Sequence, residues 1–291
     1  MNARLTPWLF LMPAIAIYGI FGAYPIFQTF AISLTDQVGV AEPGKFIGLQ
    51  NYVALMQDEY FLNALKHTGI WVIAFLIVPN SLAITIALLV KQTFWGASLI
   101  KTVFFLPLAL SFAIVGVVWG WIYEPDVGLL DQLLIGLGLE GLIVEWLGPD
   151  AATYSVIAAA AWRQTAFATV VFLAGLSAIP TELIEAAKVD GGTRRQIFFR
   201  ITLPLLKPAS TIAVSSALIH ALLATEIVLT MTEGGPFGSS EVVGYRMYME
   251  TFWNYKFGYG AAIGVIVTLM TATMVVPYVR RMAKAQERDW S

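Results

Sequence analysis

The stretch Glu185–Pro208, EAAKVDGGTRRQIFFRITLPLLKP, is polar and basic, although it lies between two long apolar segments. Its first residues favour a short helix, and Asp190-Gly191-Gly192 is a turn signal, because glycine accepts the positive φ of a tight turn. After the turn, Ile197, Phe198 and Ile201 form an apolar stripe beside three arginines. The stretch therefore predicts a helix, a glycine turn and a second helix with a charged surface that suits a soluble partner.

The composition around this stretch places the chain in a membrane. Of the 291 residues, 58% are hydrophobic and 12% are charged, and the mean hydropathy is +0.74. A water-soluble domain of this length would not tolerate such values, so we expect an integral membrane protein. The chain has no cysteine, which excludes disulfides and thiolate metal sites.

Stretches of about 20 apolar residues are long enough to cross a bilayer as helices. Six such stretches occur, at roughly 7–34, 68–90, 99–123, 153–179, 205–232 and 260–280. Twelve of the seventeen Lys and Arg residues fall on the side that holds both termini and Glu185–Pro208. Because cytoplasmic loops carry the excess of positive charge, we expect a multi-pass inner (plasma) membrane protein with both termini in the cytoplasm.

The Glu185–Pro208 stretch resembles the EAA loop of ABC importer permeases. The resemblance rests on Glu185-Ala186-Ala187, on Asp190-Gly191 and on Ile201, Leu203 and Pro204. It implies an all-α integral membrane protein with the type I ABC importer permease fold, six transmembrane helices and a cytoplasmic coupling helix that docks on an ATPase. The ATPase-coupling residues that it implies are Glu185, Ala186, Ala187, Asp190, Gly191, Arg194, Arg195 and Phe198.

A second motif, Thr232-Glu233-Gly234-Gly235-Pro236, resembles the T-x-G-G-P of carbohydrate importers. It is typical of subunits similar to the first membrane subunit of the maltose transporter. The resemblance implies a heterodimer with a second permease subunit, two ATPase subunits and an extracytoplasmic sugar-binding protein. It also implies a first transmembrane helix and outer loop over 1–64, the ABC importer transmembrane domain over 65–280 and a cytoplasmic tail over 281–291.

Three polar residues lie inside predicted spans, where they are costly and therefore candidates for function: Arg163, His220 and Glu226. Arg163 and Glu226 either neutralise each other as a buried pair or line the substrate path. For His220 the alternative is a hydrogen-bonded role in helix packing. The resemblance adds Gln164 and Phe167 to Arg163 as residues at sugar-contact positions, and Trp162 offers a flat face to a sugar ring. A neutral and an acidic sugar both remain possible, since an unpaired guanidinium suits an acidic group.

The sequence lacks G-x-x-x-x-G-K-[ST], H-E-x-x-H and any cysteine or histidine cluster. We therefore expect a transport subunit and no enzyme, with no cofactor or metal in this chain and with ATP and Mg²⁺ bound by partner ATPase subunits. No nucleic-acid partner is expected. The alternative is an ion-coupled secondary transporter that uses Glu226 and His220 as a proton or sodium relay.

Overall fold

The computed structural model describes residues 6–41, 43–91, 102 and 104–289. Regular secondary structure in these residues is helical, and an isolated bridge pairs Thr35 with Phe46. Helices satisfy their own backbone hydrogen bonds, which lipid cannot do, and this explains why the long apolar stretches adopt them. The chain divides into two compact units, Met1–Leu62 with Arg246–Leu269 and Asn63–Tyr245 with Met270–Ser291.

The first unit begins with one long apolar helical run. Its segments are α1 (Thr6–Tyr18), a π-helical segment (Gly19–Ala23) and α2 (Tyr24–Ser33). The short helix α3 (Gln50–Leu55) follows, and a second π-helical segment (Met249–Trp253) leads to α15 (Phe257–Asp289). Asn51 stabilises the loop that precedes α3, because its side-chain amide donates hydrogen bonds to the carbonyl oxygens of Ser33 and Thr35.

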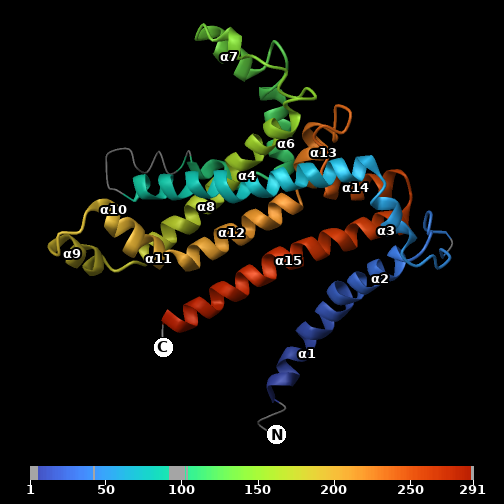
Figure 1. Cartoon of the computed structure of the whole chain (residues 1–291), viewed down its shortest axis with the longest axis horizontal. Helices are drawn as coiled ribbons and strands as arrows, with labels where there is room; N and C mark the ends of the chain where they lie inside the picture. Colours follow the sequence, from blue (N-terminus) through green and yellow to red (C-terminus); the bar gives the residue numbers. More distant parts are fainter. Residues whose placement is uncertain (1–5, 42, 92–101, 103, 290–291) are drawn as a thin grey trace. The chain divides into compact units, whose positions relative to one another are not determined.

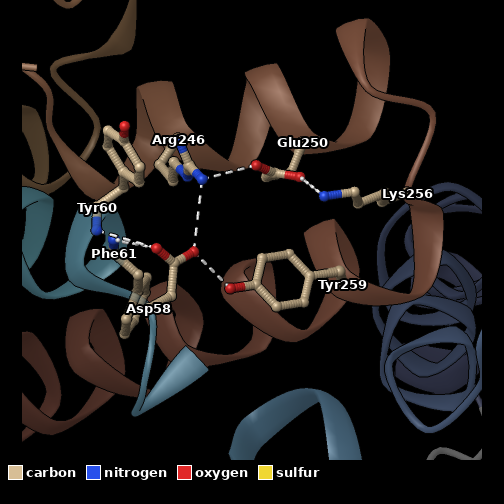
Figure 2. A network of polar contacts seen from close by, with 7 residues as sticks. All are labelled: Asp58, Tyr60, Phe61, Arg246, Glu250, Lys256 and Tyr259. Carbon is tan, nitrogen blue, oxygen red and sulfur yellow. Dashed lines mark hydrogen bonds and ion pairs between the residues drawn. The ribbon is translucent and has the colours of Figure 1, made fainter. Parts of the chain in front are cut away.

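A charged network joins distant parts of the first unit (Figure 2). Arg246 Nη2 lies 2.8 Å from Glu250 Oε1 and 3.4 Å from Asp58 Oδ2. Lys256 Nζ lies 3.3 Å from Glu250 Oε2, and the Tyr259 hydroxyl donates to Asp58 Oδ2 at 2.7 Å. The Glu250 side chain is 2% exposed. A carboxylate this buried needs compensation, and the two cations supply it.

The second unit contains most of the remaining helices (Figure 1). They are α4 (Glu59–Val90), which starts in the first unit, a 3-10 turn (Leu106–Ala109), α6 (Phe112–Ile122), α7 (Leu129–Gly136), a second 3-10 turn (Glu140–Leu142), α8 (Ala152–Ser177), α9 (Thr181–Val189), α10 (Arg194–Ile197), a π-helical segment (Phe198–Thr202), α11 (Leu203–Leu205), α12 (Lys207–Leu222), α13 (Thr225–Met231) and α14 (Val243–Tyr248), which ends in the first unit. The break between α11 and α12 bends the chain by 69°.

Helices α4, α8 and α12 contribute to one buried hydrophobic cluster of the second unit. Alanine lies at many of the contacts, and small side chains let helices approach closely where lipid gives no hydrophobic drive to association. The buried residues of this cluster are Ala83, Ala87, Ala168, Phe172, Leu176, Ile179, Leu206, Ala209 and Ala213. The core thus reaches Leu206, the residue at the bend.

Four described helices are long and apolar enough to span a membrane: Phe10–Ser33, Glu59–Val90, Ala152–Ser177 and Phe257–Arg280. They correspond to four of the six predicted spans. The predicted span 99–123 lies partly outside the described residues, and its described part ends in α6. Counting the bent pair Arg194–Leu205 and Lys207–Leu222 gives up to five spans in the described part of the chain, so the count of six stays a prediction.

The predicted span 205–232 is not one continuous helix. It stops after Leu222 and resumes at Thr225 as α13, with Leu223 and Ala224 outside helical geometry. Neither glycine nor proline marks the break, and this is why the sequence predicted an uninterrupted helix. The break lies at a cavity in the second unit.

Candidate functional site

The second unit contains a cavity of about 370 Å³, a volume within the range of small-molecule sites, about 300–1,000 Å³. Its lining includes Trp71 of α4, Phe112 of α6, Arg163 of α8, His220 of α12 and Glu226 of α13. Apolar groups such as Ile219 and Ile227 complete the wall. The three polar residues predicted from the sequence, Arg163, His220 and Glu226, therefore meet in one cavity.

Arg163 is held at the edge of α6. Its Nε donates to the Leu110 carbonyl, just before α6 begins, and its guanidinium carbon lies 4.4 Å from the centroid of the Phe112 ring. Ser111 shapes this corner, because its hydroxyl caps α6 by accepting from the Ile114 N–H at 3.2 Å. No ion pair joins Arg163 to Glu226, two described residues that line the same cavity.

His220 has one ring nitrogen engaged. Nδ1 lies 2.8 Å from the Ser216 carbonyl oxygen and 3.2 Å from the Ser216 hydroxyl, one helical turn earlier. The ring centroid lies 5.0 Å from that of Phe112. Phe112 therefore contacts two of the three predicted polar residues of the cavity, Arg163 and His220.

The other predicted substrate residues do not line this cavity. Gln164 is fully buried, and its Nε2 lies 3.4 Å from the Ser216 hydroxyl, which in turn contacts His220. Trp162 is exposed and packs edge-on against Trp119 at 5.8 Å. Phe167 is half-buried on α8. Their role in substrate binding stays a prediction.

The two aromatic residues of the cavity, Trp71 and Phe112, were not predicted from the sequence. Both lie in apolar stretches, where an aromatic residue ordinarily signals packing. The one available signal was Ser111, a helix-capping residue type directly before an apolar run, which marks a helix start near the middle of the predicted third span. A helix that starts at this point places Phe112 beside the interruption between α12 and α13 and within reach of α8.

The predicted helix, turn and helix of the Glu185–Pro208 stretch are present. Helix α9 ends at Val189, and Gly191 has a φ of +80°, the left-handed conformation that glycine accepts at low cost. Thr193 and Gln196 then form a reciprocal capping box that starts α10. The local sequence accounts for each of these boundaries.

Most of the predicted coupling residues are exposed. Glu185, Ala186, Asp190, Gly191, Arg194 and Arg195 are exposed, whereas Ala187 and Phe198 are half-buried. Val189, at the tip between the helices, is 88% exposed.

The inner face of the same loop belongs to the core. Ile184 of α9 packs against the α4, α8 and α12 cluster, and Leu206 at the bend is a fully buried member of that cluster. Ile197 of α10 is also buried. The loop is therefore packed directly against α8 and α12, the helices that carry Arg163 and His220.

The Thr232–Pro236 motif forms a closed turn after α13. Gly234 has a φ of +75°, and a side chain there would collide with the ring of Tyr245. The Tyr245 hydroxyl donates to the Glu233 carbonyl at 2.6 Å, and the Thr232 and Ser240 hydroxyls lie 2.7 Å apart. The second glycine-rich signal of the sequence is thus a packed turn beside the helix that carries Glu226.

Comparison with known proteins identifies relatives along nearly the whole chain. The family described as "Binding-protein-dependent transport system inner membrane component" matches residues 79–284. A probable ABC transporter permease protein of Pyrococcus horikoshii is 34% identical over 283 residues, which cover 96% of this chain and 96% of that protein. The diacetylchitobiose uptake system permease protein of Streptomyces coelicolor is 33% identical over 288 residues, which cover 94% and 82%.

Two crystal structures share the fold. One is of a bacterial ABC transporter involved in the import of the acidic polysaccharide alginate, with a TM-score of 0.81, 24% identity and coverage of 96% of this chain and 95% of that chain. The other is of a bacterial alginate ABC transporter in complex with alginate pentasaccharide-bound periplasmic protein, with a TM-score of 0.80, 24% identity and coverage of 94% and 92%. At this identity the likeness is one of fold.

Proposed function

The chain belongs to the family of inner membrane components of binding-protein-dependent transport systems, and from this premise we propose that it is the permease subunit that passes a sugar through an ATP-driven importer. The resemblance stated from the two sequence motifs is confirmed by the family match. The protein is a multi-pass membrane subunit of an ABC transporter and a transport component rather than an enzyme. The alternative of an ion-coupled secondary transporter does not agree with this membership.

The cavity supports the assignment of a sugar. It brings a guanidinium, an imidazole and a carboxylate together with aromatic rings inside a helical bundle, and an apolar wall with a few polar groups is typical of small-molecule sites. The relative from Streptomyces is named for the uptake of diacetylchitobiose, and the alginate transporter imports a polysaccharide. In the proposed mechanism Arg163, His220 and Glu226 contact the passing sugar.

The exposed face of the loop supports a docking role for α9 and α10. We infer that Glu185, Asp190, Arg194 and Arg195 contact a groove on an ATPase subunit, with Val189 buried in that contact. The charged residues give the contact its orientation, and the apolar tip contributes buried area. Closure of the ATPases would then move α9, and Ile184 and Leu206 would pass the movement to α8 and α12.

The remaining parts of the assembly follow from the same premise. The proposed complex contains a second permease subunit, two ATPase subunits that bind ATP and Mg²⁺, and an extracytoplasmic sugar-binding protein. Both termini and the Glu185–Pro208 loop lie in the cytoplasm, in agreement with the distribution of Lys and Arg. The domain boundaries 1–64, 65–280 and 281–291 stay a prediction.

Transport proceeds by alternating access in this proposal. The loaded binding protein docks outside, ATP closes the ATPases beneath the loop, and the helices around the cavity open outward to receive the sugar. Hydrolysis of ATP returns the inward-facing state. This chain supplies the path and the coupling surface, while the partner subunits supply the free energy.

A charge reversal on the loop tests the proposal. In the complex reconstituted with its partners, Glu185→Arg is expected to abolish sugar uptake and the stimulation of ATP hydrolysis by sugar-loaded binding protein. Glu182→Arg, an exposed carboxylate one turn earlier on α9, is the matched control and should retain most uptake. If Glu185→Arg retains both activities with the ATPase still bound, the loop does not couple hydrolysis to transport.

A further inference from the structure

The segment 124–150, between α6 and α8, carries only negative charge. The sequence contains no Lys, Arg or His from Thr102 to Trp162. The carboxylates of the segment are exposed, with the exception of Asp131, and they belong to Glu124, Asp126, Asp131, Glu140, Glu145 and Asp150. Carboxylates are costly within hydrocarbon, so the segment lies in water outside the bilayer.

The same segment exposes large apolar side chains. Leu129, Leu133 and Leu137 recur every four residues along α7 and its C-terminal cap, so this leucine row lies on one face of the helix. The three side chains are 58%, 53% and 71% exposed. Further exposed apolar residues of the segment are Val127, Ile135, Leu139, Leu142 and Val144. An exposed apolar patch with a polar rim marks a site of interaction with a protein or a membrane.

Hydrogen bonds within the segment hold α7 in place. Asp131 lies on the face of α7 opposite the leucine row and is 4% exposed. Its carboxylate accepts hydrogen bonds from the Trp146 indole N–H at 2.7 Å and from the Asp126 backbone N–H at 3.2 Å. The Trp146 ring in turn stacks on the ring of Tyr123, which caps the end of α6, with 5.8 Å between the centroids. The leucine row is therefore ordered before anything covers it, and this reduces the entropic cost of binding.

Helix α8 separates this segment from the Glu185–Pro208 loop. It begins at Ala152, directly after the segment, and ends at Ser177, shortly before α9. It is also one of the described helices that are long and apolar enough to span a membrane. The segment and the loop therefore lie on opposite sides of the membrane, which places the segment outside when the loop is in the cytoplasm.

The charge of the segment indicates what covers the leucine row. Helices that bind a membrane surface carry Lys and Arg on their polar face, which are attracted to anionic lipid headgroups. The exposed carboxylates around α7 have the opposite charge, and such headgroups would repel them. A soluble protein with Lys and Arg around an apolar patch matches both the row and its acidic surroundings.

We propose that the segment 124–150 is a docking surface for the extracytoplasmic sugar-binding protein. In the complex, apolar residues of that protein cover the leucine row, and its Lys and Arg residues face the surrounding carboxylates. The inference rests on the proposed function, and it adds to it the surface that the binding protein contacts and the charge of the face that it presents.

The affinity of the sugar-loaded binding protein for the assembled complex in lipid nanodiscs tests the leucine row. Leu133→Gln combined with Leu137→Gln should raise the dissociation constant about ten-fold. Both side chains are exposed, so the melting temperature of the complex should not change. Val40→Gln replaces an apolar residue that is 84% exposed in the loop before α3 and is the matched control, with the wild-type constant expected. A wild-type constant in the double leucine variant overturns the inference.

The dependence on salt tests the charge of the docking face. Glu140→Gln combined with Glu145→Gln should weaken binding several-fold at low ionic strength, and this difference should vanish in about 1 M salt, which screens exposed charges. Glu59→Gln removes an exposed carboxylate at the start of α4 and should leave the dependence on salt unchanged. Tighter binding of the double glutamate variant, or a loss that persists in high salt, contradicts a basic docking face and overturns the inference.

The remaining outcomes distinguish this inference from the proposed function. A wild-type complex that binds no sugar-binding protein and imports no sugar overturns the proposed function itself. If the wild type imports sugar but the leucine variant loses the second permease subunit, the leucine row is an interface between permease subunits and the inference is wrong. If the leucine variant binds more weakly in nanodiscs but normally in detergent, the row contacts the membrane surface and the inference is likewise wrong.

Discussion

Lys91 Nζ donates a hydrogen bond to the Leu176 carbonyl oxygen at a distance of 2.7 Å. Lys91 directly follows α4, and Leu176 lies in the last turn of α8. The last carbonyls of a helix have no partner within it, and a cation there also interacts favourably with the helix dipole. The contact therefore joins the ends of two core helices directly before α9 begins.

Replacing Lys91 by methionine should loosen this junction. Lys91→Met removes the hydrogen bond and keeps a similar apolar stem, so we expect a loss of about 1 kcal/mol in stability and faster amide exchange in the last turn of α8. Lys188→Met, an exposed lysine of α9, is the control. Equal amide exchange in the two variants would show that the junction does not hold the end of α8.

Leu206 should be the most sensitive position of the bend. It is fully buried in the α4, α8 and α12 cluster, and truncation of a buried leucine costs about 2–5 kcal/mol. Leu206→Ala is therefore expected to lower the melting temperature of the assembled complex by several degrees. Leu205→Ala is the matched control, because Leu205 is 44% exposed. Similar melting temperatures for the two variants would contradict the packing described for the bend.

The fold could be predicted largely from the sequence because its signals are local. Apolar runs predicted long helices such as Ala152–Ser177, and the glycine turn predicted the break between α9 and α10. The break at Leu223 and Ala224 was missed, because no residue there forbids a helix. Such a break depends on tertiary packing, which residue propensities do not contain.

The polar residues of the candidate site could be predicted from the sequence, whereas its aromatic residues could not. A charged residue in an apolar run is conspicuous, so Arg163, His220 and Glu226 were found, and they share one cavity. Trp71 and Phe112 were missed because aromatic residues are ordinary in such runs. Trp71 and Phe112 differ from the many aromatic residues that pack against other helices or lipid only because they line the cavity.

Gly191 offers a test of the turn that keeps the surface chemistry of the loop. Its φ is +80°, and no atom lies within 4 Å of the position where a side chain would begin, so Gly191→Ala adds only backbone strain, roughly 1 kcal/mol. We expect the number of sugars transported per ATP hydrolysed to fall while the complex stays assembled. Gly141→Ala, an equally open position without positive φ, should not change that ratio. An unchanged ratio in Gly191→Ala would mean that coupling tolerates a distorted turn.

The Asp58 carboxylate predicts an acid-dependent step in stability (Figure 2). Burial by itself would raise the pKa of Asp58, but the Tyr259 hydroxyl, the Arg246 guanidinium and the N–H groups of Phe61 and Tyr60 together hold this pKa below its usual value. The carboxylate therefore stabilises the fold above its unfolded pKa of about 3.9, and this contribution is lost as the pH falls through the lower pKa of the folded state.

The measurement is the melting temperature of the purified protein between neutral pH and pH 3. The wild type should lose stability below about pH 4, whereas Asp58→Asn should start less stable and lose less over the same range. Glu59→Gln removes the adjacent exposed carboxylate and should follow the wild-type curve. If Asp58→Asn and the wild type run parallel, Asp58 does not contribute to the acid response.

The Phe112 ring is expected to fix the position of the Arg163 guanidinium without changing its charge. The ring holds the guanidinium carbon at 4.4 Å and the His220 ring at 5.0 Å, and a cation over an aromatic face gains about 0.5–2 kcal/mol. In Phe112→Leu the volume is nearly kept but this attraction is lost, so Arg163 becomes free to form an ion pair with Glu226 and to withdraw its donors from the sugar. We expect KM for sugar uptake to rise several-fold with little change in kcat, because the loop and its contact with the ATPase are intact.

Phe112→Tyr keeps the aromatic face and should restore most of the affinity. A wild-type KM in Phe112→Leu would show that Arg163 is positioned by the Leu110 carbonyl alone.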